Sequence, residues 1–227
     1  MIDQTDTLFL SRVLPFWKTL TEGERQLVQQ NMVLERFDKG GAVHSGGLDC
    51  RGMIVVKSGR LRAYIVSETG REATLYRPVP GEACVLSASC ILNNIDFDVF
   101  IDAEVKSEVY VLPVQYLKEL CKTNREVEGF TNQVLAARFT DVMWVMEAIL
   151  FSSMDKRLAL FLLEQAGMEK KESLAITHEA IAGHLGSARE VVSRMLKYFE
   201  REGLVAVSRG GIRITDPAGL KKLAGLS

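Results

Sequence analysis

Short alternating runs of polar and apolar residues occupy the chain from about Val33 to Pro113. Residues 60–66 alternate between polar and apolar side chains, and residues 67–70 are typical of a turn. Residues 71–76 would then form a second strand that runs back along the first. A period of two is the pattern of a half-buried strand, and several such runs separated by glycines are typical of an antiparallel barrel or sandwich. We therefore predict a β-rich domain, with further strands at residues 97–102 and 108–112.

Helical spacing replaces this pattern on both sides of the β-rich stretch. Before it, Thr21 and Glu24 have the spacing of a capping box that opens a helix. After it, apolar residues recur at intervals of four and three along a predicted helix at 124–151, a spacing typical of a packed helix face. These residues are Leu135, Phe139, Val142, Met146 and Ile149. The face can pack on the chain's own barrel or on a second copy, and the length of the helix, about seven turns, favours a dimer.

A second module begins after the small polar residues at 152–153. Residues 156–167 predict a helix with three apolar side chains turned inward: Leu158, Phe161 and Leu162. Residues 176–203 predict two helices joined at Gly186, and residues 204–215 predict a hairpin. Two helices with a tight glycine turn form a helix-turn-helix, of which the hairpin would be the wing.

Both helices of this motif carry start signals. Thr177 is a suitable N-cap for the first helix, whose buried face we expect to contain Ile181 and Leu185. Ser187, with Glu190 three residues later, predicts a capping box at the start of the second helix. The inward face of the second helix is predicted to be Val191, Met195, Leu196 and Phe199.

The opposite face of the second helix carries groups that can read DNA. Arg189, Glu190 and Arg194 lie there. In a major groove, arginine can bond N7 and O6 of guanine, and a carboxylate can accept from the N4 amine of cytosine. The alternatives are a structural role in the capping box for Glu190 and a solvated helix face for the arginines. Three further groups are placed to bond phosphates, which fix register without reading sequence: Ser187, Ser193 and Arg209.

This arrangement resembles the CRP/FNR family of bacterial transcription regulators over nearly the whole chain. That family has a cyclic-nucleotide-binding-type β-roll, a long dimerisation helix, a hinge and a winged helix-turn-helix, in the order predicted here. Residues 189–194 match its recognition-helix pattern. The resemblance implies that Arg189, Glu190 and Arg194 read bases, with Ser193 as a further candidate, at a half-site of the TGTGA or TTGA kind. After the Thr177 cap, His178 replaces a phosphate-contacting arginine, which implies a weaker phosphate contact there.

The predicted fold is therefore α+β: an N-terminal antiparallel, cupin-like β-roll with flanking helices, a long dimerisation helix and a C-terminal winged helix-turn-helix. The predicted domains are an effector-sensing domain at 1–123, the dimerisation helix at 124–151 and a DNA-binding domain at 152–227. The expected partners are double-stranded DNA with a palindromic operator, a second copy of the chain, and RNA polymerase. A small effector in the β-roll is expected to control DNA binding.

The predicted effector pocket departs from the pattern of cyclic-nucleotide binders. Residues 80–86 resemble the start of the family's phosphate-binding cassette, in which a following arginine neutralises the phosphate. Here residues 96–98 are Asp-Phe-Asp, and a buried anion without a cation is costly. Cyclic AMP is therefore disfavoured, and Glu82, which bonds a ribose hydroxyl in nucleotide binders, is interpreted as structural. The candidate pocket residues are Gly81, Glu82, Ala83, Cys84, Val85, Leu86, Phe97 and Asp98.

The four cysteines, Cys50, Cys84, Cys90 and Cys121, leave other sensing chemistry open. FNR-type proteins carry a cysteine cluster near the N-terminus, and the first cysteine here is Cys50, so an iron–sulfur cluster is disfavoured. Cys84 and Cys90 are candidate redox thiols or, with His44, haem or metal ligands, but we favour their packing as small hydrophobes. A remote alternative is a metal-dependent enzyme or a storage barrel. Such a metal site needs several converging ligands, and the chain has only 3 His, so we expect neither an enzyme nor a metal site.

The composition, 47% hydrophobic and 25% charged, is that of a globular protein. The net charge of −1 conceals a difference between the modules, because residues from Met154 onward carry 12 Lys and Arg against 9 Asp and Glu. This excess of positive charge is a small hint of an acidic partner for the C-terminal module. No stretch approaches the ~20 apolar residues of a membrane-spanning helix, and the acidic opening is unlike a signal peptide, so we expect a cytoplasmic protein without a membrane partner.

Overall fold

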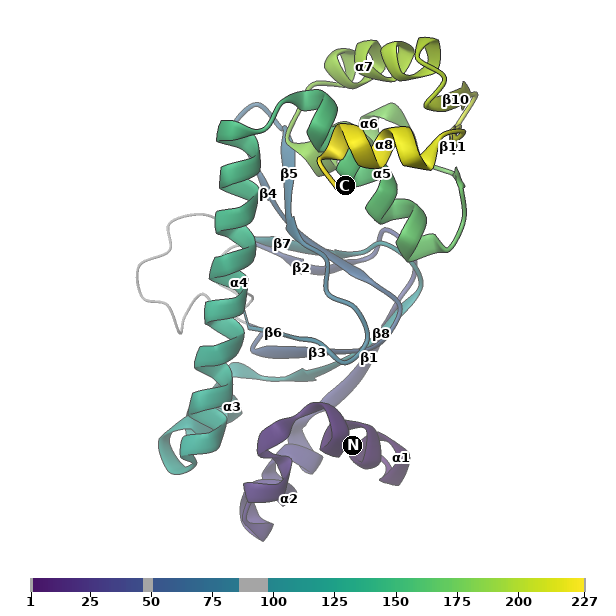
Figure 1. Ribbon diagram of the computed structural model, residues 1–227. Helices are drawn as coiled ribbons and strands as arrows, with labels where there is room; N and C mark the ends of the chain where they lie inside the picture. The colour runs from purple at the N-terminus through teal and green to yellow at the C-terminus, as the bar shows by residue number, and fades with distance from the viewer. Residues whose placement is uncertain (1, 47–50, 86–97, 227) are drawn as a thin grey trace. The chain divides into compact units, whose positions relative to one another are not determined.

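The computed structural model describes residues 2–46, 51–85 and 98–226 (Figure 1). The chain divides into two compact units. The first comprises Met1–Ile65 and Leu75–Val142, and the second comprises Val66–Thr74 and Met143–Ser227.

The first unit opens with helices that carry local start signals. These are α1 (Gln4–Val13), the 3-10 helix η1 (Pro15–Thr19) and α2 (Glu22–Asn31). The predicted capping box of α2 is confirmed, because Thr21 Oγ1 accepts from the Glu24 N–H at 3.3 Å and the Glu24 carboxylate accepts from the Thr21 N–H at 2.9 Å. Asp3 and Asp6 form a second capping box at the start of α1.

Two antiparallel four-stranded sheets form the β-roll, which confirms the fold class predicted from the alternating pattern. One has the order β1-β8-β3-β6 and the other β2-β7-β4-β5 (Figure 1). The strands are β1 (Val33–Phe37), β2 (Ala42–Ser45), β3 (Met53–Ser58), β4 (Leu61–Val66), β5 (Glu72–Tyr76), β6 (Ala83–Cys84), β7 (Phe100–Ala103) and β8 (Ser107–Leu112). The strand predicted at 97–102 corresponds to β7, and its first residue, Phe97, lies outside the described residues.

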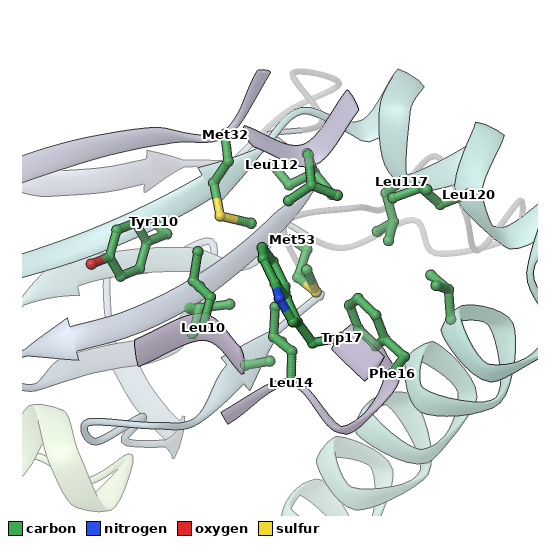
Figure 2. Close-up of a cluster of buried hydrophobic side chains, with 14 of the residues drawn as sticks. Leu10, Leu14, Phe16, Trp17, Met32, Met53, Tyr110, Leu112, Leu117 and Leu120 are labelled. Carbon is green, nitrogen blue, oxygen red and sulfur yellow. The ribbon is translucent and has the colours of Figure 1, made fainter. Parts of the chain in front are cut away.

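A continuous apolar cluster joins the N-terminal helices to the β-roll. Figure 2 shows Trp17 of η1 beside Met53 of β3, with Tyr110 and Leu112 of β8 nearby. Leu10, Leu14 and Leu117 belong to the same cluster and are almost completely buried. Burying a large apolar side chain stabilises the fold by about 1.5–3 kcal/mol, so this cluster anchors the helices to the sheet.

Two helices follow the β-roll: α3 (Val114–Thr123) and the predicted long helix, α4 (Arg125–Phe151). Val127, Thr131 and Val134 of α4 are buried, and Val127 and Val134 belong to the apolar cluster of the β-roll. The predicted stripe forms a neighbouring face of α4. Leu135 and Val142 are half-buried, whereas Phe139, Met146 and Ile149 are 67%, 47% and 46% exposed. The helix thus packs on its own barrel through one face, while Phe139, Met146 and Ile149 keep apolar surface exposed on a second face.

The second unit contains a helix-turn-helix and a small sheet. Its elements are α5 (Met154–Glu169), β9 (Ser173–Leu174), α6 (His178–Leu185), α7 (Arg189–Arg201), β10 (Val205–Ser208), β11 (Gly211–Ile214) and α8 (Pro217–Ala224). The predicted inward residues of α5 are buried in the core of this unit: Leu158, Phe161 and Leu162. The sheet has the order β10-β11-β9, and its third strand, β9, was not predicted.

None of the helices in the described ranges combines the length and apolar character needed to cross a bilayer.

Candidate nucleic-acid interface and effector pocket

The turn between α6 and α7 is the one predicted from the sequence. The Thr177 side chain accepts from the Ala180 N–H at 3.1 Å, so it caps α6 as expected. Gly186 ends α6 in the left-handed conformation, with φ of 62°. Glycine adopts this conformation without the steric penalty that a Cβ imposes, which explains its place in a sharp turn between helices.

The predicted capping box at the start of α7 is wrong. The N-cap is Ala188, and no side chain caps the helix. The N–H of Ser187 donates to the Ala182 carbonyl at 3.0 Å, so Ser187 belongs to the turn that closes α6. Glu190 is therefore exposed in the first turn of α7 without the structural role that a capping box would give it.

The buried face of α7 differs slightly from the prediction. Leu196 and Phe199 are buried as expected, but the third fully buried residue is Val192. Val191 and Met195, which were predicted to face inward, are half-buried. The apolar stripe is therefore centred closer to Val192, and the polar face of the helix remains turned outward.

Five polar side chains of α7 line a shallow, open hollow of about 330 Å³: Arg189, Glu190, Ser193, Arg194 and Lys197. Four of these residues are the predicted base readers, and Ser193 is the half-buried one among them. Lys197 was not singled out from the sequence, although it follows Arg194 by three residues and therefore shares its face. Three cations and one carboxylate on the exposed face of a helix suit the phosphates and base edges of a DNA groove.

Ser193 is connected to the start of α6. Its Oγ lies 2.8 Å from Nδ1 of His178, the first residue of that helix. Sequence spacing gave no sign of this contact, because it joins residues 15 positions apart on two helices. The two residues were assigned separately, His178 to phosphate contact and Ser193 to base or phosphate contact.

The wing is the hairpin of β10 and β11, which turns at Arg209 and Gly210. Gly210 has φ of 82°, and Arg209 is exposed beside it. The Val207 N–H donates to Glu200 Oε1 at 2.9 Å, which ties the hairpin to α7. Arg209 is thus presented on a short turn fixed to the helix that carries the other polar groups.

The predicted effector pocket is only partly within the described residues. Ala83, Cys84 and Val85 are buried, and β6 pairs with β3 through Cys84 and Ala83. Gly81 and Glu82 are half-buried and Asp98 is exposed. Leu86, Phe97 and Asp96 lie outside the described residues, as do Cys50 and Cys90.

Arg138 of α4 faces this part of the β-roll. Its guanidinium lies over the Tyr76 ring, 3.1 Å from Asp141 and 4.0 Å from Glu82. Nε of Arg138 is buried and, among the residues that the structure describes, has no hydrogen-bond partner. Sequence analysis missed Arg138, although it continues the barrel-facing spacing of Thr131 and Val134 by four residues.

Tyr76 links this arginine to Cys84. Its hydroxyl lies 2.9 Å from the Cys84 sulfur, and both side chains are buried. Burial, reinforced by Cys84, raises the pKa of Tyr76 well above its ordinary value, so the phenol stays protonated. In the described ranges no three His, Cys, Asp or Glu side chains form a metal-binding group, and Cys90, which was considered together with Cys84 and His44, lies outside those ranges.

Two family models match the chain. A cyclic nucleotide-binding domain matches residues 34–124, and a Crp-like helix-turn-helix domain matches residues 156–223. The matches coincide with the β-roll and with the unit that contains α6 and α7.

Similar proteins match along nearly the entire chain. A putative transcriptional regulator of the CRP/FNR family from Eubacterium rectale is 45% identical, with a TM-score of 0.91, over 94% of this chain and 99% of that one. The fumarate and nitrate reduction regulatory protein of Vibrio cholerae is 27% identical over 94% of this chain and 87% of its own length. A CRP/FNR-family regulator of Thermus thermophilus is 26% identical, with a TM-score of 0.67, over 85% of this chain and 98% of that one.

Proposed function

The chain belongs to the CRP/FNR family of transcription regulators, and on this premise we propose that two copies of it read a palindromic operator under the control of a small effector. Members of this family are DNA-binding regulators without enzymatic activity, so the chain is a DNA-binding transcription regulator and not an enzyme. Dimerisation, the residue roles and the effector are the proposed part.

The observation that carries the proposal is the outward face of α7. Arg189, Glu190 and Arg194 are exposed in the N-terminal half of α7, the helix that follows the Gly186 turn. In helix-turn-helix proteins the residues near the N-terminus of the second helix contact base edges in the major groove. We assign base reading to these three residues and to Ser193, and phosphate contacts to Thr177, His178, Ser187 and Arg209.

Arg194→Ala tests this assignment, with Arg201→Ala as the matched control. Arg201 is an exposed arginine in the last turn of the same helix, where it lies over the Tyr198 ring. We expect Arg194→Ala to weaken binding to the cognate operator by about 1–3 kcal/mol and to relax the preference at one base pair, whereas Arg201→Ala keeps the preference. Unchanged discrimination in the Arg194 variant would refute its base-reading role.

The exposed apolar face of α4 supports the proposed homodimer. Phe139, Met146 and Ile149 share that face and expose large apolar surface. Self-complementary apolar helix faces are the common basis of symmetric dimers, and dimer symmetry would place two recognition helices about one helical turn apart on DNA. Such a bound dimer would be positioned to contact RNA polymerase.

The effector is proposed to bind at the β-roll beside α4. The charge of Arg138 is already balanced by Asp141 and Glu82, so this arginine offers a hydrogen-bond donor rather than a spare positive charge. Its buried Nε, which has no partner within the described ranges, suits a ligand oxygen, since an unmet buried donor costs free energy. A compact molecule with an acceptor oxygen fits this environment better than a cyclic nucleotide, whose phosphate needs an uncompensated cation.

Control of DNA binding is proposed to pass through α4. The helix contributes Arg138 to the candidate pocket, and its residues belong to both compact units. An effector that binds one arrangement of α4 better than another shifts the population toward it. Native mass spectrometry of gently purified protein tests the proposal directly, and a protein that retains and responds to no small molecule would contradict it.

A further inference from the structure

The contact between His178 and Ser193 joins a group proposed to touch DNA phosphates to one proposed to touch bases. Nδ1 of His178 and Oγ of Ser193 are 2.8 Å apart, and both residues are half-buried. Ser193 lines the hollow on α7 together with Glu190 and Arg194. Within the described part of the chain, His178 makes no other hydrogen bond or ion pair, so its second nitrogen, Nε2, has no protein partner there.

The hydrogen-bonding rules of a neutral imidazole connect its two nitrogens. One nitrogen carries the hydrogen and donates, and the other accepts. When Nε2 carries the hydrogen, Nδ1 accepts and the Ser193 hydroxyl must donate to it. When Nδ1 carries the hydrogen, it donates to Ser193 Oγ, and the hydroxyl hydrogen is free to point elsewhere. The partner of Nε2 therefore determines whether the Ser193 hydroxyl can donate a hydrogen bond to a bound molecule or only accept one.

A DNA phosphate at the start of α6 selects one of these arrangements. Helix N-termini attract phosphates through their free N–H groups and their dipole, and His178 is the first residue of α6. A phosphate oxygen can only accept, so it favours hydrogen on Nε2. Nδ1 then accepts the Ser193 hydrogen, and the Oγ lone pairs remain to accept from a base.

We propose that His178 is a positioning residue that makes Ser193 a hydrogen-bond acceptor at the base edges. In the major groove, an acceptor matches the N6 amine of adenine and the N4 amine of cytosine, and does not match guanine or the O4 of thymine. This inference rests on the proposed function, because it requires α7 to lie in the major groove. It assigns a specificity role to the histidine that replaces the family's phosphate-contacting arginine.

The test uses the full chain, an operator selected from random DNA, and all single base-pair variants of its half-site. Binding is measured for His178→Ala, for Ser193→Ala and for the double variant, with Glu179→Ala as the control because Glu179 is exposed next to His178 on α6. We expect both single variants to lose a preference of about tenfold for an adenine or cytosine at the same base pair. The double variant should lose no more than Ser193→Ala alone, since the histidine acts through the serine.

Salt dependence separates this role from ordinary phosphate binding. A neutral imidazole releases no counterion, so His178→Ala should leave the dependence of affinity on salt unchanged. His178→Arg should steepen the log–log salt slope by about 1 while losing the preference that Ser193 provides. Equal weakening on every DNA sequence in His178→Ala, or additive effects in the double variant, would overturn the inference.

Arg194→Ala keeps this test distinct from that of the proposed function. If the unmodified chain discriminates among half-site variants and Arg194→Ala relaxes another base pair, the groove-binding assignment stands whatever His178 does. If Arg194→Ala also retains every preference, the proposed function fails before the inference is reached. Thermal unfolding of each variant identifies any loss of binding that comes from loss of fold.

Discussion

Arg138 holds its guanidinium carbon 4.5 Å from the centre of the Tyr76 ring, in the interior of the first unit rather than at its surface. The arginine side chain is 13% exposed, and its Nε has no hydrogen-bond partner in the part of the chain that the structure describes. A buried donor without a partner costs about 1–3 kcal/mol, which the ring contact and the Asp141 ion pair offset. The buried guanidinium of Arg138 therefore adds little to the stability of the fold. Side chains that do not stabilise the fold are typical of binding sites.

Arg138→Met should therefore leave the free energy of unfolding unchanged, or raise it by up to about 1 kcal/mol, because methionine fills the space without an unmet donor. Urea unfolding of ligand-free protein measures this, with Arg125→Met as the control on an exposed arginine of the same helix. Native mass spectrometry of the same variant should show that any retained small molecule is lost. A destabilisation of more than about 2 kcal/mol would instead make Arg138 a structural residue.

Cys84 is expected to be protected from thiol reagents in the folded protein. Its side chain is completely buried, and its sulfur contacts the Tyr76 hydroxyl. Reactive cysteines are thiolates in accessible, electropositive surroundings, and Cys84 is not accessible. Alkylation mapped by mass spectrometry should label Cys84 only after denaturation, and Cys84→Ser should leave the control of DNA binding intact. Rapid labelling of the folded protein, or lost control in Cys84→Ser, would favour the redox-sensor alternative.

Phe139→Asp should convert the proposed dimer to a monomer. Phe139 is 67% exposed on the apolar face of α4, where a charge would lose its water in a helix–helix contact. Gln133→Asp is the control, because Gln133 is exposed on a different side of the same helix. Sedimentation measures the assembly state, and operator binding should fall with it. A Phe139→Asp chain that remains dimeric would show that the contact lies elsewhere.

The elements that the sequence predicted well are those with local signals. The limits of α6 at Thr177 and Gly186 were predicted correctly because an N-cap and a left-handed C-cap each depend on a single residue. The start of α7 was mispredicted because Ser187 has the residue type of a cap but its N–H already serves the closing turn of α6. Local spacing does not reveal whether a residue between two helices closes the first helix or caps the second.

Contacts between distant segments were outside the reach of sequence patterns. Arg138 meets Tyr76 from a strand far earlier in the chain, and Val192 rather than Val191 became buried because tertiary packing selected between two adjacent valines. The two-residue strands β6 and β9 are too short to show a period of two.

Asp6 supplies a pH-dependent test of how the N-terminal helices are held on the β-roll. Its Oδ1 accepts from the Tyr110 hydroxyl at 2.5 Å and from Lys57 Nζ at 2.8 Å. Burial acts to raise the pKa of Asp6, but these hydrogen bonds outweigh it, and the net pKa is lowered. On the other side of the contact, burial and the hydrogen bond to Asp6 raise the pKa of Tyr110 to about 12.

A lowered pKa in the folded state stabilises the protein above the unfolded value of about 3.9, and this stabilisation is lost as pH falls through the folded pKa. Asp6→Asn should therefore reduce the free energy of unfolding by about 1–3 kcal/mol near neutral pH, and the difference should shrink below about pH 4. Asp38→Asn, at an exposed position, should stay within about 0.5 kcal/mol at every pH. Urea unfolding at a series of pH values measures this difference in the free energy of unfolding. If the loss of stability in Asp6→Asn stays constant into acid, the charge of the Asp6 carboxylate does not hold α1 in place.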